Sequence, residues 1–233
     1  MIGGSMKQTL LNECERLGID LTDEQTEHFV FFGNALIEKN KVMNLTAITE
    51  PQAVAKLHFA DCLALLKLAD FHKKSVIDVG CGAGFPGVPI KLGEPTVKLT
   101  LLDSLQKRVT WLRETLDSMG VEAQCVASRA EEYPHREQFD IATSRAVARL
   151  NILCELCLPF VKVGGYFLAM KAAAAQEELT ESKRAITLLG GRLERVAEYE
   201  IDGARRCVLL IRKIKPTPPQ YPRRFAKIKQ SPL

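Results

Sequence analysis

The chain has 233 residues, enough for one domain with a full hydrophobic core and a small extension. Apolar residues make up 46% of it and charged residues 26%, which is typical of soluble globular proteins. No apolar run approaches the roughly eighteen residues of a membrane span, and no basic segment followed by an apolar stretch indicates a secretory signal. We therefore expect a cytoplasmic protein without a membrane partner.

The positive charge is concentrated near the C-terminus. The net charge is +4, but nine basic and no acidic residues follow Asp202, so the first 202 residues carry −5. A near-neutral body with a basic tail favours a polyanionic partner, although a tail that only aids solubility fits the charge equally well. The basic residues are Arg205, Arg206, Arg212, Lys213, Lys215, Arg223, Arg224, Lys227 and Lys229.

Seven scattered cysteines are typical of reduced core residues. Cys154 and Cys157 form a CxxC pattern, but no second CxxC and no histidine pair lies nearby to complete four zinc ligands. We predict that both pack in the core on one helix face, and we expect no metal site.

Residues 1–70 are predicted to form an N-terminal helical extension. Apolar residues recur at helical spacing over residues 7–17. Thr22 and Gln25 have the spacing of a capping box that begins a helix reaching about residue 39. Pro51, in a first helical turn, begins a third helix that carries His58 and Asp61.

From residue 75 onward, short apolar strands alternate with helices, which predicts a mostly parallel sheet covered on both faces. The last two strands are separated only by a short turn and must pair antiparallel, as a closing hairpin. We assign residues 71–215 to this domain and residues 216–233 to an extended, basic, proline-rich tail. The predicted strands are residues 75–79, 99–103, 123–126, 139–143, 166–171, 192–200 and 206–212, and the helices between them are residues 87–92, 105–119, 149–160 and 176–189.

A glycine-rich turn, DVGCGAGFPG at residues 78–87, follows the first strand. Side chains at Gly80 and Gly82 would block a ligand from the backbone, so their absence creates a binding surface. The formal GxGxxG match at Gly82 is weak as a dinucleotide fingerprint, because it starts beyond the strand and Pro86 removes one N–H donor. The pattern Asp-x-Gly-x-Gly-x-Gly directly after a strand is instead typical of class I methyltransferases, with a Rossmann-like seven-stranded sheet. It therefore predicts S-adenosylmethionine as the cofactor.

Three further strand ends point to the same ligand. Asp103 ends the second strand, where a carboxylate can accept hydrogen bonds from ribose hydroxyls, and Ser104 can cap the next helix. Residues 128–131 follow the third strand, where an adenine ring would lie. Arg145 follows the fourth strand within residues 144–148, at the carboxyl edge where open α/β folds bind ligands. Asp103 alone does not distinguish S-adenosylmethionine from NAD.

With these motifs in order along the chain, the sequence resembles the RsmG (GidB) family of bacterial 16S rRNA guanine-N7 methyltransferases. The resemblance spans nearly the whole chain. The matching segments are residues 44–46 (NLT), 58–61 (HFAD), 78–87, 101–104 (LLDS) with Lys107 and Arg108, 129–131 (RAE), 144–148 (SRAVA) with Leu150, Lys171, and 221–223 (YPR).

The resemblance implies methylation of guanosine 527 in the 530 loop of 16S rRNA, on the small ribosomal subunit. We expect the protein to be a monomer. It places Gly80, Phe85, Ala130, Glu131 and Arg145 against S-adenosylmethionine, together with Gly82 and Asp103 from the motif analysis. The candidate contacts to substrate RNA are Asn44, His58, Lys171, Arg223 and Arg224. Two departures stand out: Cys62 replaces a serine usual in the family, and Arg224-Phe225-Ala226-Lys227 lacks a usual proline-glycine.

Guanine N7 is an in-plane lone pair without a proton at neutral pH, so methyl transfer to it needs no general base. None is evident, and we expect no catalytic residue beyond those that position the reactants. His58 and Asp61 share a helix face. They either line the guanine pocket or form a local pair that fixes the helix to the sheet, and we favour the second. Residues 44–46 either line the same cleft or cap a turn.

Two other functions remain open from the sequence. An NAD-linked oxidoreductase is favoured by the formal GxGxxG and Asp103, but the closing hairpin and the missing second domain speak against it. A non-catalytic RNA-binding protein with a vestigial cofactor pocket is allowed by the basic tail.

Overall fold

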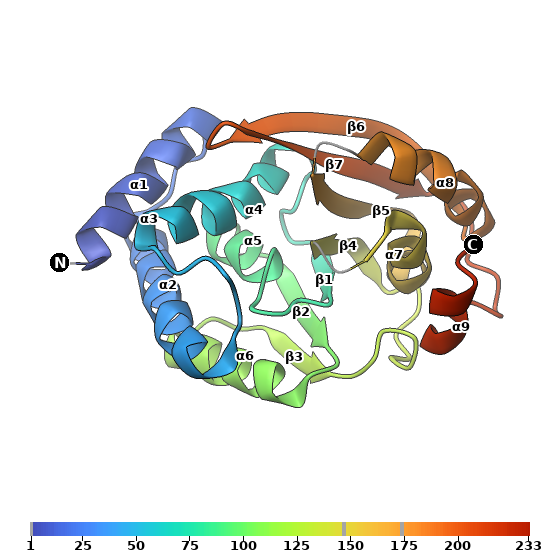
Figure 1. Cartoon of the computed structure of the whole chain (residues 1–233), viewed down its shortest axis with the longest axis horizontal. Helices are drawn as coiled ribbons and strands as arrows, with labels where there is room; N and C mark the ends of the chain where they lie inside the picture. The colour runs from blue at the N-terminus through green and yellow to red at the C-terminus, as the bar shows by residue number, and fades with distance from the viewer. Residues whose placement is uncertain (1, 146–147, 173–174) are drawn as a thin grey trace.

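A twisted sheet lies between two groups of helices (Figure 1). The computed structural model describes residues 2–145, 148–172 and 175–233. Within them seven strands form one sheet in the order β3-β2-β1-β4-β5-β7-β6, and only β7 runs antiparallel to its neighbours. This confirms the predicted fold class. The strands are β1 (Ser75–Val79), β2 (Lys98–Asp103), β3 (Gln124–Ala127), β4 (Phe139–Arg145), β5 (Val161–Ala172), β6 (Gly191–Ile201) and β7 (Ala204–Lys213).

Alternate strand residues face two separate hydrophobic cores, as the two-residue period of a strand requires. Val76 of β1 packs into one core and Ile77 into the other. The first core is covered by α1 (Ile2–Leu17), α2 (Asp23–Met43), the helical segment 51–67, α5 (Gly87–Gly93) and α6 (Gln106–Ser118). The second is covered by α7 (Leu150–Cys157), η3 (Leu158–Phe160), α8 (Ala175–Leu188) and α9 (Phe225–Gln230).

The predicted capping box at the start of α2 is present. The Gln25 backbone N–H donates to Thr22 Oγ1 at 3.2 Å, and the Thr22 N–H donates to Gln25 Oε1 at 2.8 Å. The Gln25 amide also donates to the carbonyl of Leu92 at the end of α5, at 2.9 Å. The helix cap therefore also joins the N-terminal helices to the sheet domain.

The third predicted helix is irregular. It comprises α3 (Pro51–Val54), a π-helical stretch η1 (Ala55–Ala60), α4 (Asp61–Leu63) and a 3₁₀ turn η2 (Ala64–Lys67). A π-helical turn inserts a residue into the helical repeat and is frequent at functional sites. Here the π-helical stretch carries His58 and ends directly before the buried Asp61.

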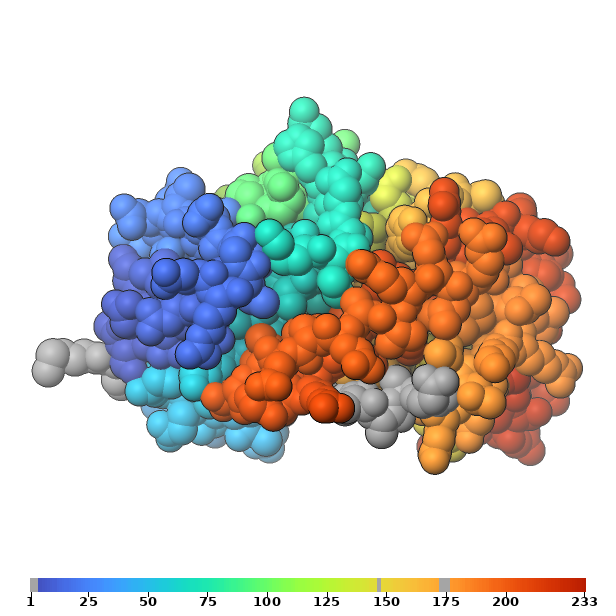
Figure 2. Space-filling view, turned by 90° about the horizontal axis from the view of Figure 1, so that it is seen from above, coloured from blue at the N-terminus to red at the C-terminus, as the bar shows by residue number. Residues whose placement is uncertain are grey.

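The hairpin of β6 and β7 extends across to the N-terminal helices, which Figure 2 shows as orange against cyan and blue. Near its tip, Asp202 accepts a hydrogen bond from Lys56 of η1 at 2.7 Å. The Tyr199 hydroxyl of β6 donates to Asp61 Oδ1 at 2.9 Å. The hairpin therefore fixes the helix that carries His58 and Asp61.

The prediction of a fully extended C-terminal tail was wrong for residues 225–230, which form α9. This stretch contains no proline, and its Ile228 is completely buried in the second core. The free energy of burying that side chain favours a helix packed on the domain.

Cys154 and Cys157 are fully buried, as predicted for core residues. In the described part of the chain, no group of three or more candidate ligands could hold a metal ion. No helix among the described residues has the length and apolar character needed to cross a membrane.

Candidate functional site

A cavity of about 300 Å³ opens at the carboxyl edge of the sheet, where β1, β2 and β3 end. Ligands of open α/β folds bind at this edge. The cavity brings together four of the seven predicted cofactor contacts, namely Gly80, Asp103, Ala130 and Glu131. Its other lining residues are Val79, Leu102, Ser104, Ser128, Arg129, Leu153, Leu156 and Phe225.

The glycine turn is held against the end of β2. The backbone N–H groups of Gly80 and Cys81 both donate to the Leu102 carbonyl, at 2.8 and 3.1 Å. Gly80 and Gly82 have φ angles of 71° and 56°, in the left-handed region that favours glycine. A Cβ atom built on Gly82 would point into open space, with the Gly80 carbonyl oxygen 3.9 Å away. The turn therefore leaves open space beside the backbone, as a binding surface requires.

Asp103 at the end of β2 organises this turn. Its Oδ2 accepts the Gly82 N–H at 2.9 Å, and its Oδ1 accepts the Leu105 N–H at 2.8 Å. Each carboxylate oxygen has a second lone pair, so both can also accept from a ligand. Asp103 is therefore suited to bind a diol, such as the two ribose hydroxyls of a nucleoside.

The loop after β3 is fixed by Arg136, whose guanidinium donates to the carbonyls of Ala130 and Glu131 at 3.2 and 2.8 Å. It also lies over the Phe160 ring, 4.8 Å from the ring centroid. These two hydrogen bonds hold the backbone of the loop in place beside the cavity. Positioning of this loop by Arg136, a few residues further along the chain, was not predicted from the sequence.

Phe85 and Arg145, two further predicted cofactor contacts, lie together in a neighbouring buried cluster. The Arg145 guanidinium carbon is 4.7 Å from the Phe85 ring centroid, and the His58 ring stacks on Phe85 at 4.4 Å. Arg145 Nη1 is 3.3 Å from Asp61 Oδ2, and its Nη2 donates to His58 Nδ1 at 2.9 Å. Ala146 and Val147 of the predicted edge segment lie outside the described residues.

His58 and Asp61 are thus joined through Arg145, which differs from the local pair that the sequence favours. Since an arginine only donates, His58 Nδ1 accepts, and the ring proton is assigned to Nε2, which lies 2.8 Å from Thr46 Oγ1. Burial, followed by the positive charge of Arg145, lowers the His58 pKa to about 3. The ring is therefore neutral, with both nitrogens in hydrogen bonds.

Asp78 on β1 is fully buried behind the glycine turn. Its Oδ2 accepts the Gly87 N–H at 2.8 Å, while Oδ1 has no hydrogen-bond partner among the described residues. Burial raises the pKa of this carboxyl to about 7, against the opposing effects of the Gly87 N–H and Arg145. An unpaired buried oxygen fits a ligand that brings a polar hydrogen, such as an ammonium group.

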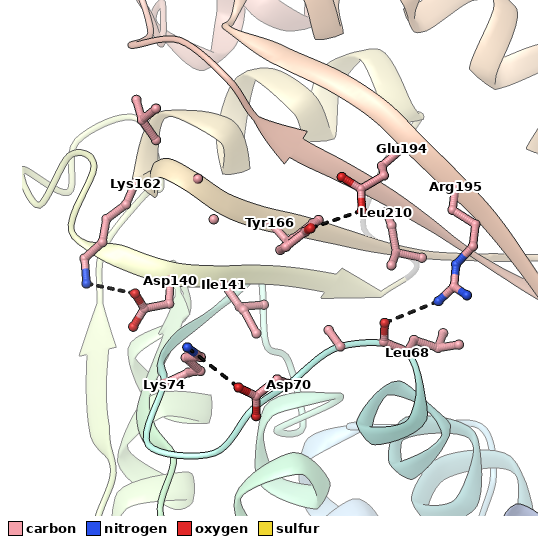
Figure 3. A pocket seen from close by; sticks show the side chains of 14 residues that line it. Leu68, Asp70, Lys74, Asp140, Ile141, Lys162, Tyr166, Glu194, Arg195 and Leu210 are labelled. Atoms are coloured by element: carbon pink, nitrogen blue, oxygen red, sulfur yellow. Dashed lines mark hydrogen bonds and ion pairs between the residues drawn. The ribbon is translucent and has the colours of Figure 1, made fainter.

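A larger pocket, of about 760 Å³, lies at the opposite edge of the sheet, by the starts of β1 and β4 (Figure 3). The polar side chains in its lining pair with groups beside them: Lys162 with Asp140 at 3.0 Å, and Tyr166 with Glu194 at 3.1 Å. Since nearby protein groups satisfy these side chains, and none of the predicted residues lies there, the smaller cavity is the better candidate site.

Two of the five predicted RNA contacts are exposed, and the other three form hydrogen bonds or ion pairs within the protein. Asn44 is an exposed C-cap of α2 in the left-handed conformation, and Arg224 is exposed at the start of α9. Lys171 donates to the Ala148 carbonyl at 2.7 Å and pairs with Glu178 at 2.8 Å. Arg223 pairs with the buried Glu155 at 2.6 Å. Lys171, Arg223 and His58 would have to exchange an internal bond to reach RNA.

Leu153, Leu156 and Phe225 line the cavity and were not predicted to do so. The two leucines are indistinguishable in sequence from ordinary core residues of α7. The one available indication was Glu155, a lone acid within an apolar helix. Such an acid needs a buried partner, and the C-terminal segment supplies it.

Comparison with known proteins identifies the family. A family model described as "rRNA small subunit methyltransferase G" matches residues 25–207. The chain belongs to this family. It is 41% identical to the Ribosomal RNA small subunit methyltransferase G of Clostridium botulinum (strain Loch Maree), over 96% of this chain and 97% of that protein. It is 44% identical to the enzyme of the same name from Alkaliphilus metalliredigens, over 97% and 98% of the two chains.

Among solved structures, the chain is similar to one described as a SAM-dependent methyltransferase from Aquifex aeolicus. The TM-score is 0.54 at 18% identity, and the match covers 75% of this chain and 97% of the other. The predicted family resemblance is thus confirmed: the chain is a member of the rRNA small subunit methyltransferase G family, and it shares its fold with a SAM-dependent methyltransferase.

Proposed function

We propose that the chain transfers a methyl group from S-adenosylmethionine to N7 of guanosine 527 in the 530 loop of 16S rRNA, as a cytoplasmic monomer acting on the small ribosomal subunit. The observation that carries the proposal is the cavity at the carboxyl edge, within a chain whose relatives are named rRNA small subunit methyltransferases. The acceptor guanosine and its N7 rest on the resemblance found in the sequence.

The residues present fit the cofactor. Asp103 has free lone pairs for two ribose hydroxyls, and the open space beside Gly80 and Gly82 admits a nucleoside against the backbone. The unpaired Oδ1 of Asp78 suits the ammonium group of a methionine moiety. Ala130 and Glu131, positioned by Arg136, would flank the adenine. When bound, S-adenosylmethionine supplies an activated methyl group on a sulfonium.

Arg145 and Phe85 are proposed to contact the methionine end. Asp78 of β1 is in register with Thr143 of β4, so Arg145, two residues beyond Thr143, lies near the level of Gly80. Accepting a methyl group makes the guanine positively charged. A guanidinium close to N7 would destabilise that charge by repulsion. The internal bonds of Arg145 to Asp61 and His58 hold that charge in the protein.

No general base takes part in the proposed reaction. The N7 lone pair attacks the methyl carbon in line with the departing sulfur, and no proton has to leave first. His58, which lies beside Arg145 and Phe85, is unsuited to proton transfer because both ring nitrogens form hydrogen bonds and its pKa is about 3. The chain then acts by alignment, which can supply roughly 7–11 kcal/mol of the barrier.

The proposed RNA contacts are the exposed Asn44 and Arg224, with His58, Lys171 and Arg223 as further candidates. An in-loop guanine also has to be exposed or flipped before its N7 reaches the methyl group.

The decisive experiment uses 30S subunits from a strain that lacks this methyltransferase, incubated with the protein and S-adenosylmethionine carrying a labelled methyl group. Mass-spectrometric mapping should place one labelled methyl on guanosine 527. A label on another nucleotide would refute guanosine 527 as the methyl acceptor. The absence of any label would refute the proposed methyl transfer. Calorimetry with NAD tests the alternative oxidoreductase, and NAD binding without S-adenosylmethionine binding would refute the proposed cofactor.

A further inference from the structure

The C-terminal segment, residues 216–233, returns to the domain and packs beside α7, as the red end of the chain shows in Figure 1. α7 contributes Leu153 and Leu156 to the cofactor cavity, and the C-terminal segment contributes Phe225. Two segments about seventy residues apart in sequence therefore form one side of that cavity.

One attachment of the segment is an ion pair with α7. Glu155 is fully buried, and its Oε1 accepts both the backbone N–H and the Nε–H of Arg223, at 2.9 and 2.8 Å. Its Oε2 accepts from Nη2 of the same arginine at 2.6 Å. This two-pronged geometry is the strong form of the arginine–carboxylate interaction. Without the segment, Glu155 would be a buried charge that has lost this partner, a costly state.

A second attachment lies where the segment leaves β7. The amine of Lys213, fully buried, donates to the Leu158 carbonyl at 2.7 Å and pairs with Glu137 at 3.2 Å. Thr217 accepts from the same amine at 2.5 Å, and its own N–H donates to Glu137 at 2.8 Å. Beyond Phe225, the fully buried Ile228 anchors α9 in the second core. Phe225 is thus held between fixed points.

We propose that Phe225 is a cofactor-binding residue, whose ring forms the C-terminal wall of the cavity and packs against the adenosine part of the methyl donor. The same cavity lining also carries Asp103 and residues 128–131, the groups suited to a ribose and an adenine. A planar base stacks well on an apolar wall of leucines and an aromatic ring. Arg223, the residue that fixes this wall, is then a positioning residue. The inference rests on the proposed function for the identity of the ligand.

The test is isothermal calorimetry with S-adenosylhomocysteine, the product form of the donor, in the absence of RNA. Phe225→Ala should weaken binding by about tenfold, since loss of one base–aromatic stack has an effect of this size. Phe225→Leu, which keeps an apolar wall, should weaken it less. The matched control is Phe31→Ala, which removes the same side chain from an exposed site on α2 outside the cavity lining, and should leave affinity unchanged.

A second measurement is independent of any substitution. Amide hydrogen exchange in residues 223–230 of the wild-type protein should slow when S-adenosylhomocysteine binds. One contrary outcome is that the wild type binds S-adenosylhomocysteine with the same affinity as Phe225→Ala and shows unchanged exchange. That result would refute the proposed role of Phe225 in cofactor binding without contradicting the methyltransferase function. Failure of the wild type to bind S-adenosylhomocysteine at all would overturn both.

Discussion

Arg145 Nη2 donates to His58 Nδ1 at 2.9 Å, which joins the last residue of β4 to the N-terminal helical region. Asp61, in the next turn, pairs with the same guanidinium and also accepts from Tyr199 of the hairpin. A side chain at the ligand-binding edge of the sheet is therefore positioned by elements from both ends of the chain. The N-terminal helices and the hairpin thus contribute to the geometry of the site.

Arg145→Lys should destabilise the protein by about 1–3 kcal/mol, because a single ammonium cannot satisfy His58, Asp61 and the Leu57 carbonyl together. Because we place Arg145 by the methionine end of the donor, affinity for S-adenosylhomocysteine should also fall by about tenfold. Urea unfolding and calorimetry measure the two effects. Arg206→Lys, whose Nε lies 3.7 Å from Asp61, is the control. Equal effects of both variants would contradict the role assigned to Arg145.

Gly80→Ala should weaken S-adenosylhomocysteine binding by at least about tenfold, because it adds a methyl group to a residue that lines the cavity and has a φ of 71°. The strain alone costs about 1–2 kcal/mol. Gly120→Ala isolates that cost, since Gly120 has φ of 66°, with nothing within 4 Å of a Cβ atom, and lies outside the cavity lining. Calorimetry should find normal affinity in the control, and a parallel loss in both would refute the placement of the cofactor.

Asp78→Asn tests the raised pKa of the buried carboxyl. The pKa is about 7 in the folded protein against 3.8 for the free side chain, so between these pH values the folded state retains a proton that the unfolded chain has lost. The stability of the wild type relative to the variant should therefore fall as pH rises from about 4 to about 7, by up to about 4 kcal/mol, and then level off.

Urea unfolding of both proteins across this range gives the difference directly. His58, whose lowered pKa gives a slope of opposite sign, is present in both proteins and should largely cancel. The asparagine oxygen can still accept the Gly87 N–H. A stability difference that does not vary with pH would show that Asp78 has no raised pKa.

The sequence predicted the sheet well because apolar alternation and turn chemistry are local. The predicted strand at residues 75–79 coincides with β1. The short link between the last two strands, two residues in the structure, requires the antiparallel pairing that is observed. Gly80, Asp103, Ala130 and Glu131 meet because the ends of parallel strands share one edge. The sequence did not predict how Arg145 connects to His58 and Asp61, since those partners come from distant segments.

The C-terminal segment was hardest to predict because its order depends on long-range contacts, among them the pair of Arg223 with Glu155. Arg223 and Phe225 look like residues of a solvated basic tail until Glu155 is known to be buried. Prolines on both sides of residues 225–230 also weaken any local indication of a helix. Its structure is determined by tertiary packing rather than by local propensity.

Two exposed cations, Arg224 at the N-cap of α9 and Lys227 within the helix, should still affect RNA binding, as predicted for the basic tail. Arg224 and Lys227 are exposed, and within the described residues neither has an ion-pair partner. Replacing both with glutamine should flatten the plot of log affinity against log salt by about 0.7 for each lost phosphate contact, measured with 16S rRNA fragments that contain the 530 loop. Stability should change little, since neither side chain is buried.

The control pair for this measurement is Lys98→Gln with Arg192→Gln, which removes the same charge at the opposite edge of the sheet, where β2 and β6 begin. Both side chains are exposed, so the control should also fold normally. If the tail contacts phosphates, the salt slope changes for the first pair only. Equal changes would show that net charge alone attracts RNA, and unchanged slopes in both would leave the tail without a role in RNA binding. In either case Phe225 would keep its separate test in cofactor affinity, because that measurement contains no RNA.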